Sequence, residues 1–246
     1  MHHAICFFLV VTFGIASFVD AAETTRQAAG GVGWERAKID DVFRSEGVAV
    51  ADVNHDGKRD VLAGDVWYEA PDWKMHAIRP VGEYVAGKGY SNSFANFACD
   101  VNGDGWDDFI VIGFPGAPFH WYENPKNEPG HWKEHLIWHS ACNETPDFED
   151  INGDGHKDIV TGKRFFAHNG RDPGGKDPAV MYWYEVRRQK GSPPTFIPHE
   201  ITAGRDTGVG TQFVVTDIDG NGRRDIVLSN KKGVNILLGT GTPNRK

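Results

Sequence analysis

One nine-residue pattern recurs four times in this chain of 246 residues and limits what the chain can fold into. The copies are DVNHDGKRD (52–60), DVNGDGWDD (100–108), DINGDGHKD (150–158) and DIDGNGRRD (217–225). Their first residues are 48, 50 and 67 positions apart. Self-similarity at such spacings is typical of proteins built from one repeated supersecondary unit. The sequence therefore predicts four copies of one structural unit.

The segments around each copy predict β-strands. Runs such as GVAVADV and FANFACDV lead into the pattern, and runs such as RDVLAGD and DDFIVIG leave it, rich in Val and Ile. Trp-Tyr-Glu recurs at 67–69, 121–123 and 183–185, and a Trp/Phe-x-x-His-x-Ile motif starts at 73, 132 and 196. Each unit thus contains four short antiparallel strands, which is typical of a propeller blade. We expect an all-β chain, a β-propeller of four-stranded antiparallel blades with about four repeats.

The two ends of the chain suggest how such a ring closes. The fourth unit stops after GVNILLG and lacks its outer strand, whereas Trp34 and Ile39 have the spacing of Trp73 and Ile78. An outer strand donated from the N-terminus would complete the last blade and hide the sheet edges. The alternatives are part of a larger propeller or a divergent fifth blade.

The N-terminus predicts export. The apolar run 5–18 is too short to span a bilayer but suits a secretory signal; a plain N-terminal anchor is the alternative. We expect a signal peptide (1–21), a flexible linker (22–30), the propeller (31–240) and a tail (241–246), with a secreted or periplasmic location. The net charge of −8 without basic runs argues against nucleic-acid binding. Cys99 and Cys142 either form a disulfide or remain two free thiols.

The nine-residue pattern offers several oxygen ligands on one tight turn. Asp or Asn stands at positions 1, 3, 5 and 9, a backbone carbonyl is available at position 7, and Gly at position 6 permits the bend. Such a set suits up to four Ca²⁺ ions. The EF-hand is excluded, because position 12 holds Ala63, Val111, Thr161 or Leu228 in place of Glu. Plain Asx turns without metal are the alternative, and repulsion among the carboxylates argues against them. The predicted ligands are Asp52, Asn54, Asp56, Lys58 and Asp60; Asp100, Asn102, Asp104, Trp106 and Asp108; Asp150, Asn152, Asp154, His156 and Asp158; and Asp217, Asp219, Asn221, Arg223 and Asp225.

The last copy is expected to bind calcium least well. Asn221 replaces the Asp at its position 5, and two arginines follow.

These loops and the strands after them resemble the FG-GAP/VCBS repeats of integrin α-subunit propellers and of exported bacterial proteins. The resemblance covers roughly Gly31 to Gly239. It implies a propeller in which each loop binds Ca²⁺ between the first and second strands of a blade. It implies almost nothing about activity.

A ligand site is expected where the repeat is broken. Trp-Tyr-Glu and His-x-Ile recur in the units and are interpreted as packing between blades. The longest insertion, Gly162–Ala179, joins a second to a third strand, so it emerges opposite the acidic loops, together with Tyr90, Asn92, Lys231 and Lys232. Its cations favour an anionic sugar. The candidate ligand residues are Lys163, Arg164, His168, Arg205, Asp206 and Glu144.

Two functions fit these features. The first is a secreted, calcium-stabilised binding or scaffold module for carbohydrate or protein ligands. The alternative is a carbohydrate-active enzyme of the lyase or sugar dehydratase type, in which Glu144, His168 and Asp206 supply acid–base groups. No familiar hydrolase or metalloprotease motif is present.

Overall fold

The structure is a computed structural model that describes residues 33–141, 146–173, 178–189, 192–201 and 207–241. The chain divides into two compact units, residues 1–39 and 40–246. Residues 33–39, the described part of the first unit, form no strand or helix. The predicted signal peptide, the linker and Cys142 lie outside the described residues.

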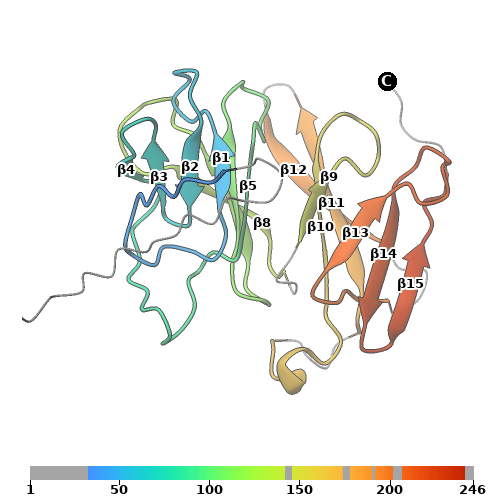
Figure 1. The fold of residues 1–246 in the computed structure, drawn as a ribbon. Helices are drawn as coiled ribbons and strands as arrows, with labels where there is room; N and C mark the ends of the chain where they lie inside the picture. The colour runs from blue at the N-terminus through green and yellow to red at the C-terminus, as the bar shows by residue number, and fades with distance from the viewer. Residues whose placement is uncertain (1–32, 142–145, 174–177, 190–191, 202–206, 242–246) are drawn as a thin grey trace, which may run out of the picture. The chain divides into compact units, whose positions relative to one another are not determined.

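The second unit contains four antiparallel sheets (Figure 1), which are named here in chain order. Within each sheet the strands pair in sequence order, so each is a meander. This arrangement confirms the predicted blades. Sheet 1 holds β1 (Ala49–Ala51), β2 (Asp60–Ala63), β3 (Val66–Glu69) and β4 (Lys74–Ala77); sheet 2 holds β5 (Ala95–Cys99), β6 (Asp108–Ile112), β7 (Phe119–Glu123) and β8 (Lys133–Trp138); sheet 3 holds β9 (Asp147–Glu149), β10 (Asp158–Gly162), β11 (Met181–Gln189) and β12 (Ser192–Glu200); sheet 4 holds β13 (Phe213–Thr216), β14 (Asp225–Asn230) and β15 (Gly233–Leu237). A 3-10 turn, η1 (Ala167–Gly170), lies in the long insertion.

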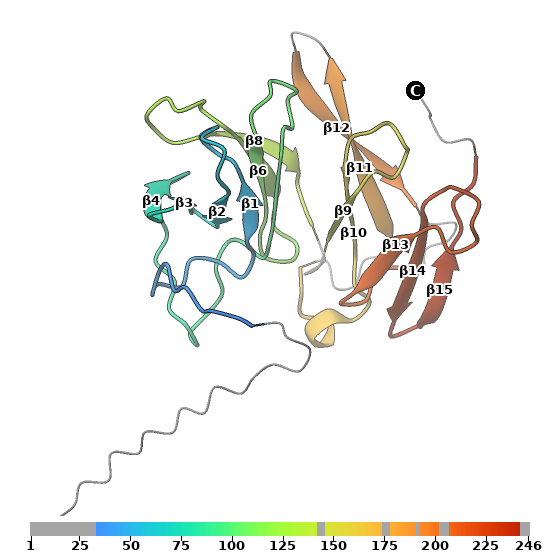
Figure 2. The same ribbon diagram turned by 45° about the horizontal axis from the view of Figure 1, so that its top comes forward.

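Sheet 4 has three strands, and no fourth strand pairs with β15 among the described residues (Figure 2). The predicted closure by an N-terminal strand is therefore wrong for this structure. The segment 34–39, which was expected to supply that strand, forms no strand.

Corresponding residues of the sheets form two rows, one on each sheet face, because neighbouring residues of a strand point to opposite faces. Positions are counted from the first residue of each acidic loop, so positions 10 and 11 lie in the second strand of a sheet. In the first row, the residue at position 11 pairs with a residue of the third strand; in the second row, the residue at position 10 does so. We call the face of the first row the forward face and that of the second row the backward face. The forward pairs are Leu62–Trp67, Ile110–Trp121, Val160–Trp183 and Val227–Ile236. The backward pairs are Val61–Tyr68, Phe109–Tyr122, Ile159–Tyr184 and Ile226–Leu237.

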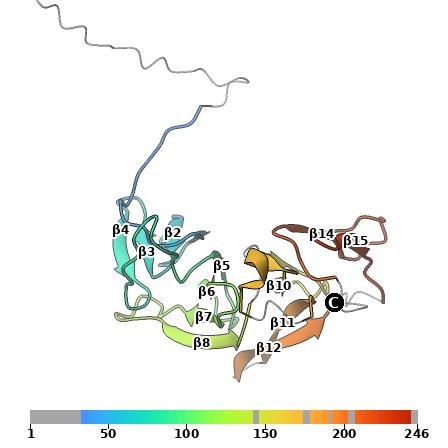
Figure 3. The ribbon, with the colours of Figure 1, turned by 90° about the horizontal axis from the view of Figure 1, so that it is seen from below.

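The hydrophobic core lies between neighbouring sheets. Three clusters of buried side chains join sheet 1 to sheet 2, sheet 2 to sheet 3, and sheet 3 to sheet 4. In each cluster the forward face of one sheet meets the backward face of the next, as when Ile110 packs with Ile159. Figure 3 shows sheets 2 and 3 side by side, in keeping with their shared cluster.

The recurring tryptophan and histidine contact each other across two strands of one sheet. In sheets 1 to 3 the two rings stack with centroids 4.1–4.3 Å apart. The histidine Nε2 also lies 2.7–2.8 Å from the Glu of Trp-Tyr-Glu. The structural interpretation of these motifs is thus supported, although the histidine contact lies within a sheet and not between blades. The pairs are Trp67–His76, Trp121–His135 and Trp183–His199.

Cys99 is a free thiol at the end of β5. Burial raises its pKa to about 12. Within the described part of the chain, no helix has the length and apolar character needed to cross a membrane.

Candidate metal loops and the opposite face

The four acidic loops (52–60, 100–108, 150–158 and 217–225) connect the first and second strands of the sheets. In the second loop, Asp100 accepts hydrogen bonds from the N–H groups of Gly103, Asp104 and Gly105 at 2.7–3.0 Å. Asn102 also accepts from the N–H of Asp104, at 2.9 Å. Gly105 has a φ of 91°, which a residue with a side chain rarely adopts. The same pattern of bonds in the other loops fixes a common shape.

The aspartate at position 9 has a structural role that the sequence interpretation missed. Both carboxylate oxygens of Asp108 accept backbone hydrogen bonds, from Val101 at 3.0 Å and from Asn124 at 2.8 Å. This carboxylate ties the loop to the end of the third strand, and it is fully buried. We call these residues the clamp aspartates: Asp60, Asp108, Asp158 and Asp225.

The clamp aspartates differ in their electrostatics. Burial raises the pKa of Asp108 and Asp158 to about 7. For Asp225, hydrogen bonds from the N–H groups of Gly239 and Ile218 lower the pKa. A bound cation would favour the charged form of each carboxylate that faces it.

Lysines neutralise part of the charge in the first two loops. Lys58 lies 2.6 Å from Asp56, and its hydrogen bond lowers the pKa of that carboxyl. Lys126 lies 3.0 Å from Asp104. Burial alone would raise the pKa of Asp104, but the hydrogen bonds from Lys126, from the N–H of Trp106 and from Asn102 have the larger effect, so this pKa is lowered. The repulsion that the sequence suggested is thus smaller in these two loops, while the third and fourth loops hold no such lysine pair among the described residues.

The fourth loop brings three carboxylates closest together. Oxygens of Asp217, Asp219 and Asp225 lie within 4.8 Å of one another. Arg223 does not fill this space, because its guanidinium donates to the carbonyls of Gly239 and Gly241 at 3.0 and 3.1 Å. The loop ranked last from sequence therefore offers the most compact carboxylate group in the part of the chain that the structure describes.

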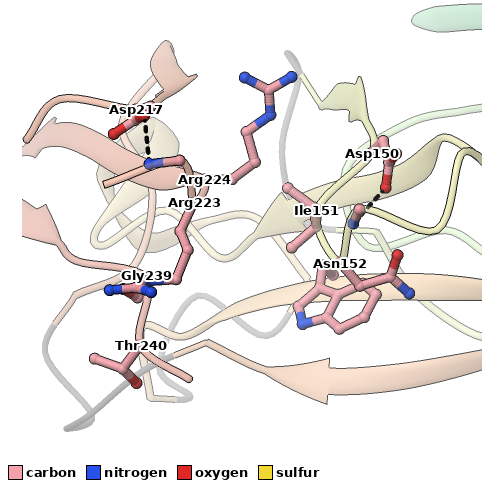
Figure 4. A pocket seen from close by; sticks show the side chains of 11 residues that line it. Asp150, Ile151, Asn152, Asp217, Arg223, Arg224, Gly239 and Thr240 are labelled. Carbon is pink, nitrogen blue, oxygen red and sulfur yellow. Dashed lines mark hydrogen bonds between the residues drawn. The ribbon is translucent and has the colours of Figure 1, made fainter. Parts of the chain in front are cut away.

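A groove of about 520 Å³ lies beside the third and fourth loops (Figure 4). Similar grooves of about 680 and 570 Å³ lie beside the first and second loops, and each contains a Trp-His-Glu cluster. The loops are therefore open to solvent from the side. The groove beside the third and fourth loops is lined by residues that include Asp150, Ile151, Asn152, Trp183, Asp217, Arg223 and Arg224.

The long insertion lies at the opposite ends of the strands, as predicted; Figure 1 shows its 3-10 turn below β10 and β11. The three described candidate residues in it are less available than expected. Lys163 is buried. Arg164 lies 3.3 Å from Asp172 with most of its side chain covered, and His168 lies 2.7 Å from the same carboxylate. Glu144, Arg205 and Asp206 lie outside the described residues.

Two neighbouring aromatic rings are exposed at this end of the molecule. Phe165 and Phe166 are exposed, and Lys231 and Lys232 lie over their rings at 4.6–5.3 Å. Lys231 also donates to the carbonyl of Phe166 at 2.8 Å. The insertion and the β14–β15 turn therefore share one surface, as predicted for the two lysines.

A second aromatic group lies on the same end. Tyr90, Phe94 and Phe114 have ring centroids 5.5–5.6 Å apart. Their loop meets the insertion, since a Cβ on Gly116 would stand 2.5 Å from Pro173. We call the five residues Tyr90, Phe94, Phe114, Phe165 and Phe166 the aromatic face. The adjacent Phe-Phe pair in an otherwise polar insertion was the available sequence signal.

The fold and the loops define a class, a repeat protein of propeller-type blades with an acidic loop in the first hairpin of each sheet. The model of the FG-GAP-like repeat matches residues 100–161. These residues run from the second acidic loop into β10, about one repeat, and the resemblance seen in the sequence is confirmed there. An FG-GAP-like repeat in such blades indicates a binding or scaffold module. No curated protein matches the sequence.

Proposed function

We propose that the protein is an exported, calcium-stabilised binding module that holds a carbohydrate or protein ligand on its aromatic face. The observation that supports the proposal is that the two ends of the strands carry different kinds of side chains. Oxygen-rich loops stand at one end, and exposed aromatic rings with flanking lysines stand at the other. Extracellular location is common among FG-GAP repeats, which supports export.

The loops fit calcium by their chemistry. Their side-chain donors at positions 1, 3 and 5 are carboxylate and amide oxygens, which suit a hard cation. The backbone bonds to position 1 hold the ligand residues in place before any cation arrives. Asp217 and Asp219 would hold the ion in the fourth loop, where the Arg223 guanidinium donates to the carbonyls of Gly239 and Gly241 and does not pair with these carboxylates. FG-GAP repeats often bind calcium.

Calcium is expected to raise the melting temperature by several degrees over the value in chelator. A ligand at 100 times its Kd adds about 2.7 kcal/mol per site to the stability of the folded state. The sharper variant is Asp219→Asn, because the other three loops carry Asn at this position and fold with it. This variant should melt like the wild type in chelator and bind one Ca²⁺ equivalent about 10-fold more weakly by calorimetry. Identical melting curves with calcium and with chelator would contradict the calcium proposal.

The insertion has an unusual backbone, which is in keeping with a ligand surface there, although the connections at the other end of the sheets also contain positive φ values. Phe166, His168 and Asn169 adopt φ values of 53°, 44° and 61°, in the left-handed region that residues with side chains seldom occupy. Such strain persists where the surroundings enforce it, and it concentrates at binding sites. Exposed aromatic groups mark ligand or protein interfaces on soluble proteins.

Replacing Phe165 and Phe166 together with alanine is expected to weaken ligand retention at least about 10-fold, because flat rings offer contact area to sugar rings or apolar side chains. The measurement is affinity electrophoresis in gels that contain a neutral or an acidic cell-wall polysaccharide. Leu136→Ala, at an exposed apolar residue of the outer strand β8, is the matched control. Equal retention of the double variant and the control would place the ligand elsewhere. If neither polysaccharide retains the wild-type protein, the carbohydrate part of the proposal is wrong and a protein ligand is left.

A further inference from the structure

The last sheet carries an uncovered apolar face. In sheets 1 to 3 the forward residues Leu62, Ile110 and Val160 are 0% exposed, because the next sheet covers them. Sheet 4 has Ile236 in the forward row, and this side chain is 52% exposed. The same face also carries Val214 and Val234, both exposed.

The first sheet carries the complementary face. The backward residues Phe109, Ile159 and Ile226 of the other sheets are buried against the preceding sheet. In sheet 1 this face is apolar and partly open: Val50, in register with Val61, is 55% exposed. Its exposed neighbour on the same face is Met75, which is in register with Tyr68. Tyr68 of this face is buried, and its hydroxyl donates to Asp40 at 2.5 Å.

We infer that the forward face of sheet 4 packs on the backward face of sheet 1 of a second copy of this chain. The chain already contains three interfaces of this kind, so the new contact continues an interface type that the repeat is built to make. The exposed residues named on both faces are aliphatic or methionine. The ion pair of Asp40 and Arg44, 2.9 Å apart, contacts the sheet 1 face at Tyr68. Sheet 1 of the same chain does not cover sheet 4, since Val50 and Ile236 are both exposed.

A second copy satisfies both open faces at once. Each copy offers one forward face and one backward face, so two copies can make two equivalent head-to-tail contacts and close as a pair. Burying aliphatic side chains on both sides gives the contact its driving force, about 25 cal/mol per Å² of apolar surface. Large exposed apolar surfaces of this kind are otherwise an aggregation risk.

Sedimentation velocity of the mature chain at roughly 1–100 μM tests the inference. We expect a dimer. Val50→Asp and Ile236→Asp should each weaken dimerisation at least about 100-fold, because a carboxylate would be buried without a partner. A mixture of the two variants should form a heterodimer that neither variant forms alone, because Ile236 of the first variant meets Val50 of the second in one intact contact. This heterodimer should be weaker than the wild-type dimer, since the second contact would place two aspartates opposite each other. Val85→Asp, at a residue that is also 55% exposed but lies in the β4–β5 connection, should stay dimeric.

Several results would overturn the inference. A wild-type chain that is monomeric at 100 μM, about the upper end of the tested range, shows that the faces do not associate. A dimer that survives either Asp variant uses another surface. If the mixture shows no more association than either variant alone at about 100 μM, with both variants folded by circular dichroism, the forward face does not meet the backward face. Both changes are at exposed residues, so we expect both variants to melt like the wild-type monomer. Their melting curves therefore test whether unfolding causes any loss of dimerisation.

Discussion

Replacing the clamp aspartate Asp108 with alanine is expected to lower the free energy of unfolding by about 3–5 kcal/mol. The carboxylate is fully buried, and its two oxygens accept from the N–H groups of Val101 and Asn124. Alanine leaves both donors buried without an acceptor, at a cost of about 1–3 kcal/mol each. Urea unfolding in chelator measures the effect, so that bound calcium contributes nothing to it.

Asp104→Ala in the same loop is the matched control for this prediction. Its carboxylate is partly exposed and pairs with Lys126 at the surface, where such pairs contribute little to stability. We expect a loss of less than about 1 kcal/mol. Asp108→Asn should fall between the two, because the amide keeps one acceptor oxygen and turns a donor toward the second N–H. If Asp108→Ala and Asp104→Ala cost the same, the clamp does not hold the loop.

The sequence predicted the strands well because each repeat carries its own local signals. Val- and Ile-rich runs flank a loop with Gly at the position that needs a positive φ, and the pattern occurs four times. The role of position 9 was not predictable in this way. An aspartate that binds a metal and an aspartate that accepts two buried N–H groups look alike in sequence, so the second role becomes visible only in the structure.

The N-terminal segment does not complete sheet 4, and the physical reason is that a histidine and a tryptophan side chain are absent. In sheets 1 to 3 the outer-strand histidine stacks on the tryptophan of the third strand. The segment 34–39 has no histidine, and sheet 4 has Ile236 in place of that tryptophan. Spacing alone matched Trp34 and Ile39 to an outer strand, but neither partner of the stacking contact is present.

The ligand residues were the least predictable part. Arg164 and His168 share Asp172, a pairing that depends on how the insertion folds back on itself. Sequence spacing does not reveal such a pairing in a loop. Only the recurring Trp-Tyr-Glu and His-x-Ile motifs were interpreted as packing, and Phe165 and Phe166 were assigned no role. Both rings are exposed because the insertion leaves the sheet and has no neighbouring sheet to cover it.

Gly208→Ala is expected to lower the free energy of unfolding by about 2–4 kcal/mol and to loosen the aromatic face. A Cβ at this position would stand 2.1 Å from the carbonyl oxygen of Lys163 and 2.6 Å from the Cβ of Ala179. Both neighbours flank the insertion, and neither is the end of a flexible side chain. The backbone around the insertion must therefore move to admit a methyl group, although the next residue, Val209, is fixed in the core between sheets 3 and 4.

Gly89→Ala is the control, because nothing lies within 4 Å of a Cβ there and the residue has no positive φ. It should change stability by less than about 0.5 kcal/mol. Urea unfolding gives the size of the effect, and hydrogen exchange of the insertion shows where it acts. We expect faster exchange in residues 163–173 of Gly208→Ala and unchanged exchange in β6 of sheet 2, since the clash is local to sheet 3 and its link to sheet 4. If Gly208→Ala is as stable as the wild type, residue 208 does not pack closely against the insertion. In that case this contact does not hold Phe165 and Phe166 in place.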